Sequence, residues 1–230
     1  MTAWQADSVR ACVFDFDGTL VDTMQGFADL AGELLEKFYG IELARGRRLY
    51  LETSGIPFFQ QLEIIRPGGS HNQACAEQFE QRKLEGFFST RPTTETLVAL
   101  EALRAGGLKV VVSSNNFQHN IEQYLARRQV PVDLALGFDA ERGIEKGRTH
   151  FQLVRRHFGL APSQLLFCGD SLKDGERAGD SGVAFVGLVG TFSREQFQER
   201  FPGIVTVNSI GELARLLGCQ PSGLSASGGR

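Results

Sequence analysis

The chain has 230 residues and a net charge of −3 at pH 7, from 24 basic and 27 acidic side chains. This length is sufficient for one large domain, or for a domain with an added module, around a sizeable core. The basic residues are scattered, so there is no cationic footprint for nucleic acid, and no apolar run is long enough to span a bilayer. We therefore expect neither nucleic acid nor a membrane among its partners.

Cysteine usage indicates a reducing compartment. The chain has four cysteines and no Cys-x-x-Cys pair, so their spacing predicts neither a zinc site nor a disulfide framework. Residues 1–10 lack the apolar core of a signal peptide. We expect a cytoplasmic protein.

The first predicted element is a short buried strand, the apolar run Ala11–Phe14, which ends in Asp15-Phe16-Asp17-Gly18. Alternate residues of a strand share a face, so both carboxylates can leave the strand end in the same direction. Two like charges that close favour a cation between them, and oxygen ligands of this kind suit Mg²⁺. For these residues alone, an ordinary turn rich in Asp and Gly is the alternative interpretation.

Helical spacing dominates the next segment, residues 23–90. It contains no convincing strand, so we predict a helical insert after the first strand. Helices are expected at 27–38, around 45–52, after residue 57 and over 73–86. The loop 53–58 carries both Gly55 and Pro57, which shape tight loops. Phe58 and Phe59 follow, and packing within the helical insert is a better explanation for them than contact with a substrate.

From residue 91 onward, strand and helix patterns alternate. Strands are predicted at 109–113, 132–136, 165–168, 184–186 and 204–207, and helices at 94–105, 118–129, 149–158 and 194–200. A last helix begins at Ser209, which forms a capping box with Glu212. Such alternation predicts an α/β fold with a Rossmann-like parallel sheet core flanked by helices. Residues 1–22 and 91–219 form this core domain, 23–90 the helical domain, and 220–230 a disordered tail.

Polar side chains follow three further predicted strands. Ser113 and Ser114 come after one strand, and their hydroxyls are good phosphate donors. Gly169-Asp170 ends another, with Asp174 four residues later, and Lys146 lies in the loop that follows the strand predicted at 132–136. Ligands of parallel sheets bind beyond the carboxyl ends of the strands, so we expect these groups to form one site.

The segment Val13–Thr23 resembles the first motif of the haloacid dehalogenase superfamily, a strand followed by Asp-x-Asp-Gly-Thr. The resemblance extends over residues 10–190 and favours the capped phosphatase branch, which includes phosphoglycolate phosphatases and β-phosphoglucomutase-like proteins. It implies that Asp15 is the nucleophile and Asp17 the general acid and base. It also implies that the helical domain 23–90 is a cap that closes over the site.

The other motifs imply further roles. Ser113 would bind phosphate, with Ser114 and Asn115 offering backbone N–H groups. Lys146 would neutralise the nucleophile and a phosphate oxygen. This chain has Gly147 where relatives often have proline, which leaves Arg142 and Arg148 as alternative partners. The implied metal site consists of Asp15, the backbone carbonyl of Asp17, Asp170 and Asp174.

The function that follows is magnesium-dependent hydrolysis of a small-molecule phosphate monoester through an aspartyl phosphate. We expect a monomer or a weak dimer with Mg²⁺ as cofactor. The loop 53–58 contains no Lys or Arg, so we expect it to contact the leaving group and to favour a small or partly apolar alcohol over a second phosphate or carboxylate. The alternative is that basic residues elsewhere in the helical domain, such as Arg45 or Arg82, supply a positive charge.

Four alternatives remain. A dehalogenase needs neither Asp17 nor the acids after the later strand, and a phosphomutase usually has a basic residue in the loop 53–58. A phosphonate hydrolase needs a cap lysine, for which Lys37 and Lys83 are available. A non-catalytic phosphate-binding module could retain the fold alone. The four histidines do not cluster in the sequence, and we assign none of them a catalytic role.

Overall fold

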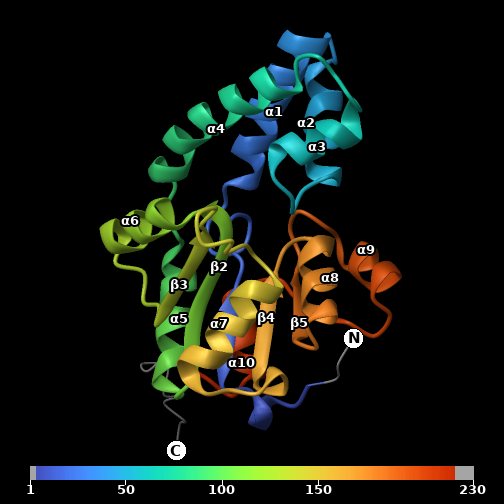
Figure 1. Ribbon diagram of the computed structural model, residues 1–230. Coiled ribbons are helices and arrows are strands. Elements are labelled where there is room, and N and C mark those ends of the chain that lie inside the picture. Colours follow the sequence, from blue (N-terminus) through green and yellow to red (C-terminus); the bar gives the residue numbers. More distant parts are fainter. Residues whose placement is uncertain (1–3, 221–230) are drawn as a thin grey trace, which may run out of the picture.

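The computed structural model describes residues 4–220, which form a six-stranded parallel sheet surrounded by helices (Figure 1). The strand order is β3-β2-β1-β4-β5-β6. The strands are β1 (Ala11–Phe14), β2 (Lys109–Phe117), β3 (Leu134–Phe138), β4 (Leu165–Gly169), β5 (Ala184–Leu188) and β6 (Val205–Val207). The predicted α/β fold with a parallel sheet is confirmed.

The first strand lies in the middle of the sheet. Ala11 of β1 pairs with Lys109 of β2 on one side and with Leu165 of β4 on the other. Because all the pairings are parallel, the carboxyl ends of the strands meet at one edge. Asp15 after β1 and Asp170 after β4 are therefore neighbours at that edge.

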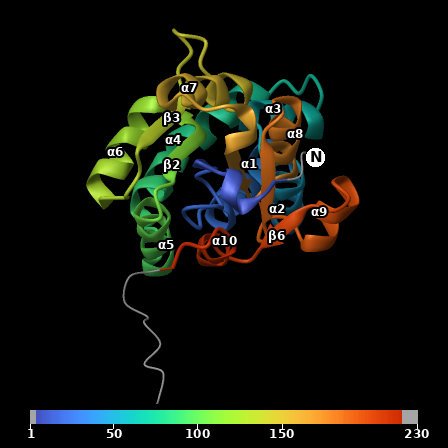
Figure 2. The same cartoon turned by 90° about the horizontal axis from the view of Figure 1, so that it is seen from below.

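Helices cover both faces of the sheet (Figure 2). One face is covered by α5 (Thr94–Ala105), α6 (Gln118–Arg128) and α10 (Ile210–Leu216), and the other by α7 (Arg148–Phe158), α8 (Leu172–Asp180) and α9 (Arg194–Arg200). Single turns of 3₁₀ helix span Ala6–Ser8 and Pro162–Gln164. A strand buried on both faces requires a continuous apolar run, which explains the sequences of β1 and β4.

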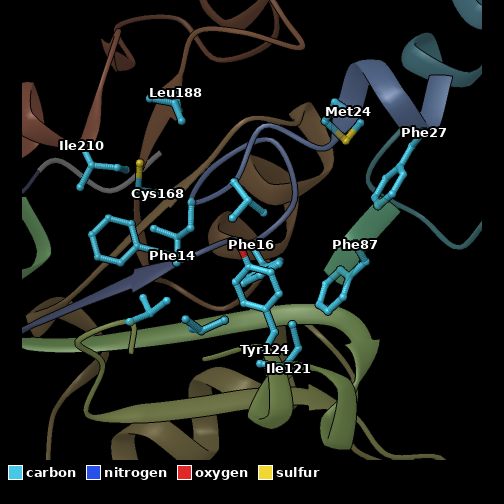
Figure 3. Packing of buried hydrophobic residues seen from close by; sticks show 14 of the residues in the cluster. Phe14, Phe16, Met24, Phe27, Phe87, Ile121, Tyr124, Cys168, Leu188 and Ile210 are labelled. Carbon is cyan, nitrogen blue, oxygen red and sulfur yellow. The ribbon is translucent and has the colours of Figure 1, made fainter. Parts of the chain in front are cut away.

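Alternate residues of β1 enter the two halves of the core. Val13 packs on the side of α7, whereas Phe14 packs on the side of α5 and α10. The part of the core that contains Phe14 continues beyond the strand to Phe16. The ring centroid of Phe16 lies 4.9 Å from that of Tyr124 and 5.3 Å from that of Phe87 (Figure 3). This aromatic group joins the sheet to the last helix of the segment 23–90.

Four helices stand above the carboxyl edge of the sheet (Figure 1). They are α1 (Met24–Tyr39), α2 (Leu43–Glu52), α3 (Phe58–Ile65) and α4 (Asn72–Ser89). Helices α1 and α2 cross at two glycines, where a Cβ atom on Gly46 would lie 2.9 Å from the Cα atom of Gly32. The absence of side chains at both positions permits this close contact. The predicted helical character of residues 23–90 agrees with this arrangement.

Three details differ from the predicted elements. Strand β2 continues to Phe117, because Phe117 pairs with Phe138 of β3 after an irregular stretch that begins at Ser113. The apolar pattern predicts no helix over residues 172–180, where the structure has α8. The capping box at Ser209 is only half formed, because the Glu212 carboxylate accepts from the backbone N–H of Asn208 instead.

The four cysteines are free and buried, as expected of small apolar side chains in a core. Among residues 4–220, no helix combines the length and the apolar character required to cross a membrane. Residues 221–230 of the predicted tail lie outside the described residues.

Candidate active site

A tight turn after β1 positions the first acidic residue. The backbone N–H of Asp15 continues the ladder to β4 by donating to the carbonyl of Cys168 (2.9 Å). Gly18 then adopts a φ of 77°, and a Cβ atom there would overlap the Asp170 carboxylate and lie 2.6 Å from Cγ of Met24. Only glycine combines this φ with such a close approach, so the turn brings the backbone directly against Asp170.

Three acidic side chains meet beside this turn. Asp15, Asp170 and Asp174 are all buried, and one oxygen of each lies within 4.8 Å of the others. Burial raises the pKa of Asp15 to about 6, with Lys146 opposing the rise and Asp174 adding to it. Burial, together with the charges of Asp15 and Asp174, raises the pKa of Asp170 well above its usual range. Such a cluster is costly without a cation.

Lys146 supplies part of the missing charge. Its Nζ atom lies 2.6 Å from Oδ1 of Asp15 and 2.7 Å from Oδ1 of Asp174, and its side chain is only 3% exposed. Burial works to lower the pKa of Lys146, but the two carboxylates raise it above its usual value, so the ammonium stays charged. Arg142 pairs with Asp139 instead, and Arg148 is exposed. The residue that reaches Asp15 from this loop is therefore Lys146.

Asp17 has different neighbours from Asp15. Its carboxylate accepts hydrogen bonds from Oγ1 of Thr23 (2.8 Å) and Nδ2 of Asn116 (2.5 Å). The sequence predicts that the side chains of Asp15 and Asp17 share one cation. In the structure, the carboxylates grouped with that of Asp15 are instead those of Asp170, at the end of β4, and Asp174, at the start of α8. Asp17 lines the cavity beside them, in a position to act on a ligand.

Asp170 and Asp174 are held by local hydrogen bonds. Ser171 caps helix α8: its hydroxyl donates to Oδ2 of Asp174 (2.8 Å) and accepts from the Asp174 backbone N–H (3.2 Å). The Thr191 hydroxyl donates to Asp170. The contact of Ser171 could be predicted from the sequence, because Ser-x-x-Asp is a helix-capping pattern. The contact of Thr191 with Asp170 has no such local pattern.

The hydroxyl of Ser113 is committed to a buried histidine. Its Oγ atom lies 2.8 Å from Nδ1 of His150, and Nε2 of His150 lies 3.1 Å from the carbonyl of Gly137. A carbonyl only accepts, so Nε2 carries the proton in neutral His150, and Nδ1 accepts from Ser113. The Ser113 proton therefore cannot also be donated to a phosphate. This geometry argues against the predicted phosphate-binding role of Ser113.

The polar groups of β2 that reach the cavity are the amides. Asn115 and Asn116 line it, whereas Ser113 and Ser114 do not. The Ser114 hydroxyl accepts from both the backbone N–H and Nδ2 of Asn116, each at 3.1 Å. Ser114 thus orients the amide that binds Asp17, a role that no local pattern in the sequence indicates.

A cavity of about 740 Å³ separates the acidic cluster from helices α1, α3 and α4. Ser54 to Phe58 of the loop 53–58 line it, and the carbonyl of Gly55 accepts from Nη1 of Arg177 (2.8 Å). Phe58 is buried, with its ring centroid 4.3 Å from that of Phe79. As expected, Phe58 mainly packs among the helices of residues 23–90, whereas the exposed Phe59 also lines the cavity.

Residues 12–188 match the family of haloacid dehalogenase-like hydrolases. Because this match covers most of the chain, the protein belongs to that family, as the motifs predicted. The predicted assignment to a family of enzymes is therefore confirmed.

The chain is also similar to curated proteins. It is 25% identical to the phosphoglycolate phosphatase of Synechococcus elongatus, over 82% of this chain and 87% of that protein. It is 26% identical to the phosphoglycolate phosphatase of Escherichia coli (strain K12), over 92% of this chain and 94% of that protein. These names agree with the predicted phosphatase branch.

A solved haloacid dehalogenase-like hydrolase of Streptococcus pneumoniae superposes on the chain with a TM-score of 0.73 and 17% identity. The superposition covers 91% of this chain and 99% of that one. At this identity, the likeness shows the fold alone.

Proposed function

We propose that the chain is a magnesium-dependent phosphatase that hydrolyses a small-molecule phosphate monoester through an aspartyl phosphate on Asp15. The observation that carries this proposal is the grouping of Asp15, Asp170 and Asp174 within 4.8 Å, with Nζ of Lys146 2.6 Å from Asp15. The similarity to curated phosphatases of nearly the same length supports it.

The donor set fits Mg²⁺. Three buried carboxylates face the Lys146 ammonium and the Arg177 guanidinium, which lies 3.5 Å from Asp174, so the cluster retains excess negative charge. Hard oxygen ligands suit Mg²⁺. Asp15, Asp170, Asp174 and the backbone carbonyl of Asp17 would hold it. When bound, the cation would neutralise charge on the phosphate oxygens.

The chain's own residues divide the chemistry. A carboxylate oxygen of Asp15 forms a bond to phosphorus as the bond to the leaving alcohol breaks, and Asp17 gives that alcohol its proton. Asp17 then removes a proton from water, whose oxygen attacks phosphorus and releases Asp15. Lys146 balances the charge of the phosphate. Asn116 and Thr23 orient Asp17 through their hydrogen bonds.

We also propose that residues 23–90 act as a cap domain on a core of residues 1–22 and 91–219. The two crossings between these parts lie at either end of the helical segment, before α1 and after α4. Movement about both crossings would admit the substrate and then exclude bulk water. The contact between Gly55 and Arg177 joins the two parts at the site.

One of the alternatives, a phosphonate hydrolase, involves two cap lysines that the structure locates. Lys37 bonds to Gln78 at the surface and does not line the cavity, whereas Lys83 does. Lys83 keeps a phosphonate hydrolase as the second candidate. Hydrolysis of phosphonoacetaldehyde, with trapping of an imine on Lys83 by borohydride, would identify that activity.

The test of the proposed function is hydrolysis of p-nitrophenyl phosphate with Mg²⁺ and after addition of EDTA. We expect turnover that requires the metal and that falls at least about a hundredfold in Asp15→Asn, because the amide retains the shape but is not a nucleophile. Mass spectrometry should exclude deamidation of the variant. No hydrolysis of this or any other phosphate ester in a broad screen would refute the proposal.

A further inference from the structure

We infer that the alcohol part of the substrate bears an apolar ring-sized group that is uncharged or cationic, and carries no second anion. This inference rests on the proposed function and specifies its substrate class. It concerns the wall of the cavity that lies away from the acidic cluster.

The size of the cavity is the first argument. At about 740 Å³, it lies within the range typical of pockets for drug-sized ligands. A two-carbon acid such as glycolate would leave most of this space unfilled. The cavity therefore fits a larger leaving group than the small alcohol expected from the loop 53–58 alone.

The second argument is the apolar rim. Three large side chains from different elements line the cavity while remaining exposed: Phe59 of α3 (42%), Leu84 of α4 (39%) and Phe117 of β2 (47%). The rings of Phe117 and Phe138 lie 5.7 Å apart, and both line the cavity. Exposed apolar surface gathered around a cavity, rather than scattered, indicates a binding surface. Such a surface gains free energy by burying a ring.

Charge is the third argument. Besides the acidic cluster, Asp17 and Lys146, the charged residues among the described residues that line the cavity are the acids Glu77, Glu80 and Glu145 and the bases Lys83 and Arg177. The Nζ atom of Lys83 lies 3.9 Å from Glu80 and 5.2 Å from the ring centroid of Phe27. The Arg177 guanidinium donates to Gly55 and lies 3.5 Å from Asp174, so the acidic cluster already offsets its charge. A second carboxylate or phosphate would therefore face more negative than positive charge.

A matched series of esters tests size and charge separately. We would measure kcat/KM for ethyl phosphate, benzyl phosphate, 4-(aminomethyl)benzyl phosphate, 4-carboxybenzyl phosphate and 2-phosphoglycolate. The ring should raise kcat/KM about tenfold or more over ethyl phosphate, because its burial gains the free energy of an apolar side chain. The aminomethyl ester should equal or exceed benzyl phosphate, and the carboxybenzyl ester should fall well below it.

Variants of the residues that line the cavity test whether these residues cause the preference among the esters. Phe59→Ala and Phe117→Ala should reduce the ratio of benzyl to ethyl phosphate several-fold, whereas the control Ile64→Ala, an exposed apolar residue of α3 that does not line the cavity, should not. Glu77→Gln and Glu80→Gln should improve the carboxybenzyl ester selectively. Glu85→Gln, on α4 but outside this cavity, is the matched control.

The outcomes separate the inference from the proposed function. Hydrolysis with 2-phosphoglycolate or the carboxybenzyl ester as the best substrate would overturn the inference and leave the phosphatase intact. A preference that the four cavity variants do not alter would also overturn it. Failure to hydrolyse any ester would refute both.

Discussion

Ser113 and Ser114 are adjacent hydroxyls on opposite faces of β2, and their partners predict different effects of mutation. Ser113→Ala leaves Nδ1 of the buried His150 without a donor, which should cost about 1–3 kcal/mol of stability. It should leave kcat/KM within about threefold of wild type, because its proton is not available to a ligand. Urea unfolding and turnover of p-nitrophenyl phosphate would measure the two quantities.

Ser114→Ala should show the opposite pattern. It removes an acceptor that orients Asn116, and Asn116 binds Asp17. The kcat should therefore fall about two- to tenfold, which corresponds to the free energy of one hydrogen bond.

If Ser113→Ala abolished turnover without loss of stability, the phosphate-binding role predicted from the sequence would be restored.

His150 makes stability dependent on pH. Burial, with Lys146 and Arg177 adding to it and the Gly137 carbonyl opposing, lowers its pKa from 6.5 to about 4. The unfolded chain therefore binds a proton below pH 6.5 that the folded protein does not accept until about pH 4. Stability is complete above the unfolded pKa, and about 3 kcal/mol of it is lost as the pH falls through this window.

The check compares wild type with His150→Gln, whose amide can donate to Gly137 and accept from Ser113. Urea unfolding at pH 7 and pH 4.5 should show a smaller loss of free energy in the variant, because the other titrating groups are common to both proteins. Equal losses in the two proteins would contradict a neutral, buried His150.

At the scale of helices and strands, the packing of α3 against α4 distinguishes two adjacent phenylalanines. Phe58→Ala should lower the free energy of unfolding by about 3–5 kcal/mol, because it leaves a cavity beside Phe79 and Tyr50. Phe59→Ala, its exposed neighbour, should change it by less than about 0.5 kcal/mol. Urea unfolding would measure both, and equal effects would contradict the contrast in burial.

Most elements could be predicted because their apolar residues follow a helical or strand period. Helix α8 reads Leu-Lys-Asp-Gly-Glu-Arg-Ala-Gly-Asp, with few apolar residues to mark a period, although the cap at Ser171 was a usable signal. The extension of β2 is imposed by its pairing with β3, since Ser and Asn have little preference for strands.

The sequence predicts those site residues that directly follow a strand or lie in the loop after one. Asp15, Lys146, Asp170 and Asp174 follow strands that a parallel sheet must bring to one edge, and the structure groups them there. The contact of His150 with Ser113 depends on how α7 packs on β2, and no local pattern encodes it. The contacts of Asn116 with Asp17 and of Thr191 with Asp170 are of the same kind.

At the scale of the whole molecule, the acidic cluster should link metal binding to stability. A cation that binds only the folded protein stabilises it by about 2.7 kcal/mol at a hundred times its Kd. Mg²⁺ should therefore raise Tm, and EDTA should reverse the rise.

Asp170→Asn should remove most of this response, whereas the exposed Asp180→Asn should retain it. Sodium chloride of matched ionic strength serves as the control for screening. A shift in Tm that is equal in wild type and Asp170→Asn would exclude Asp170 as a ligand.

The central place of β1 has a consequence for synthesis of the chain. Ala11 emerges from the ribosome well before its partners Lys109 and Leu165, which are about a hundred and about a hundred and fifty residues further along the chain. At typical translation speeds, the second partner follows on the order of ten seconds later. Until then, the apolar segment Ala11–Phe14 has an unpaired edge, the kind of surface that chaperones cover and that other nascent chains can pair with. A pause in translation between residues 15 and 169 would prolong that exposure, so the speed of ribosomes over the codons between β1 and β4 should affect the yield of folded protein.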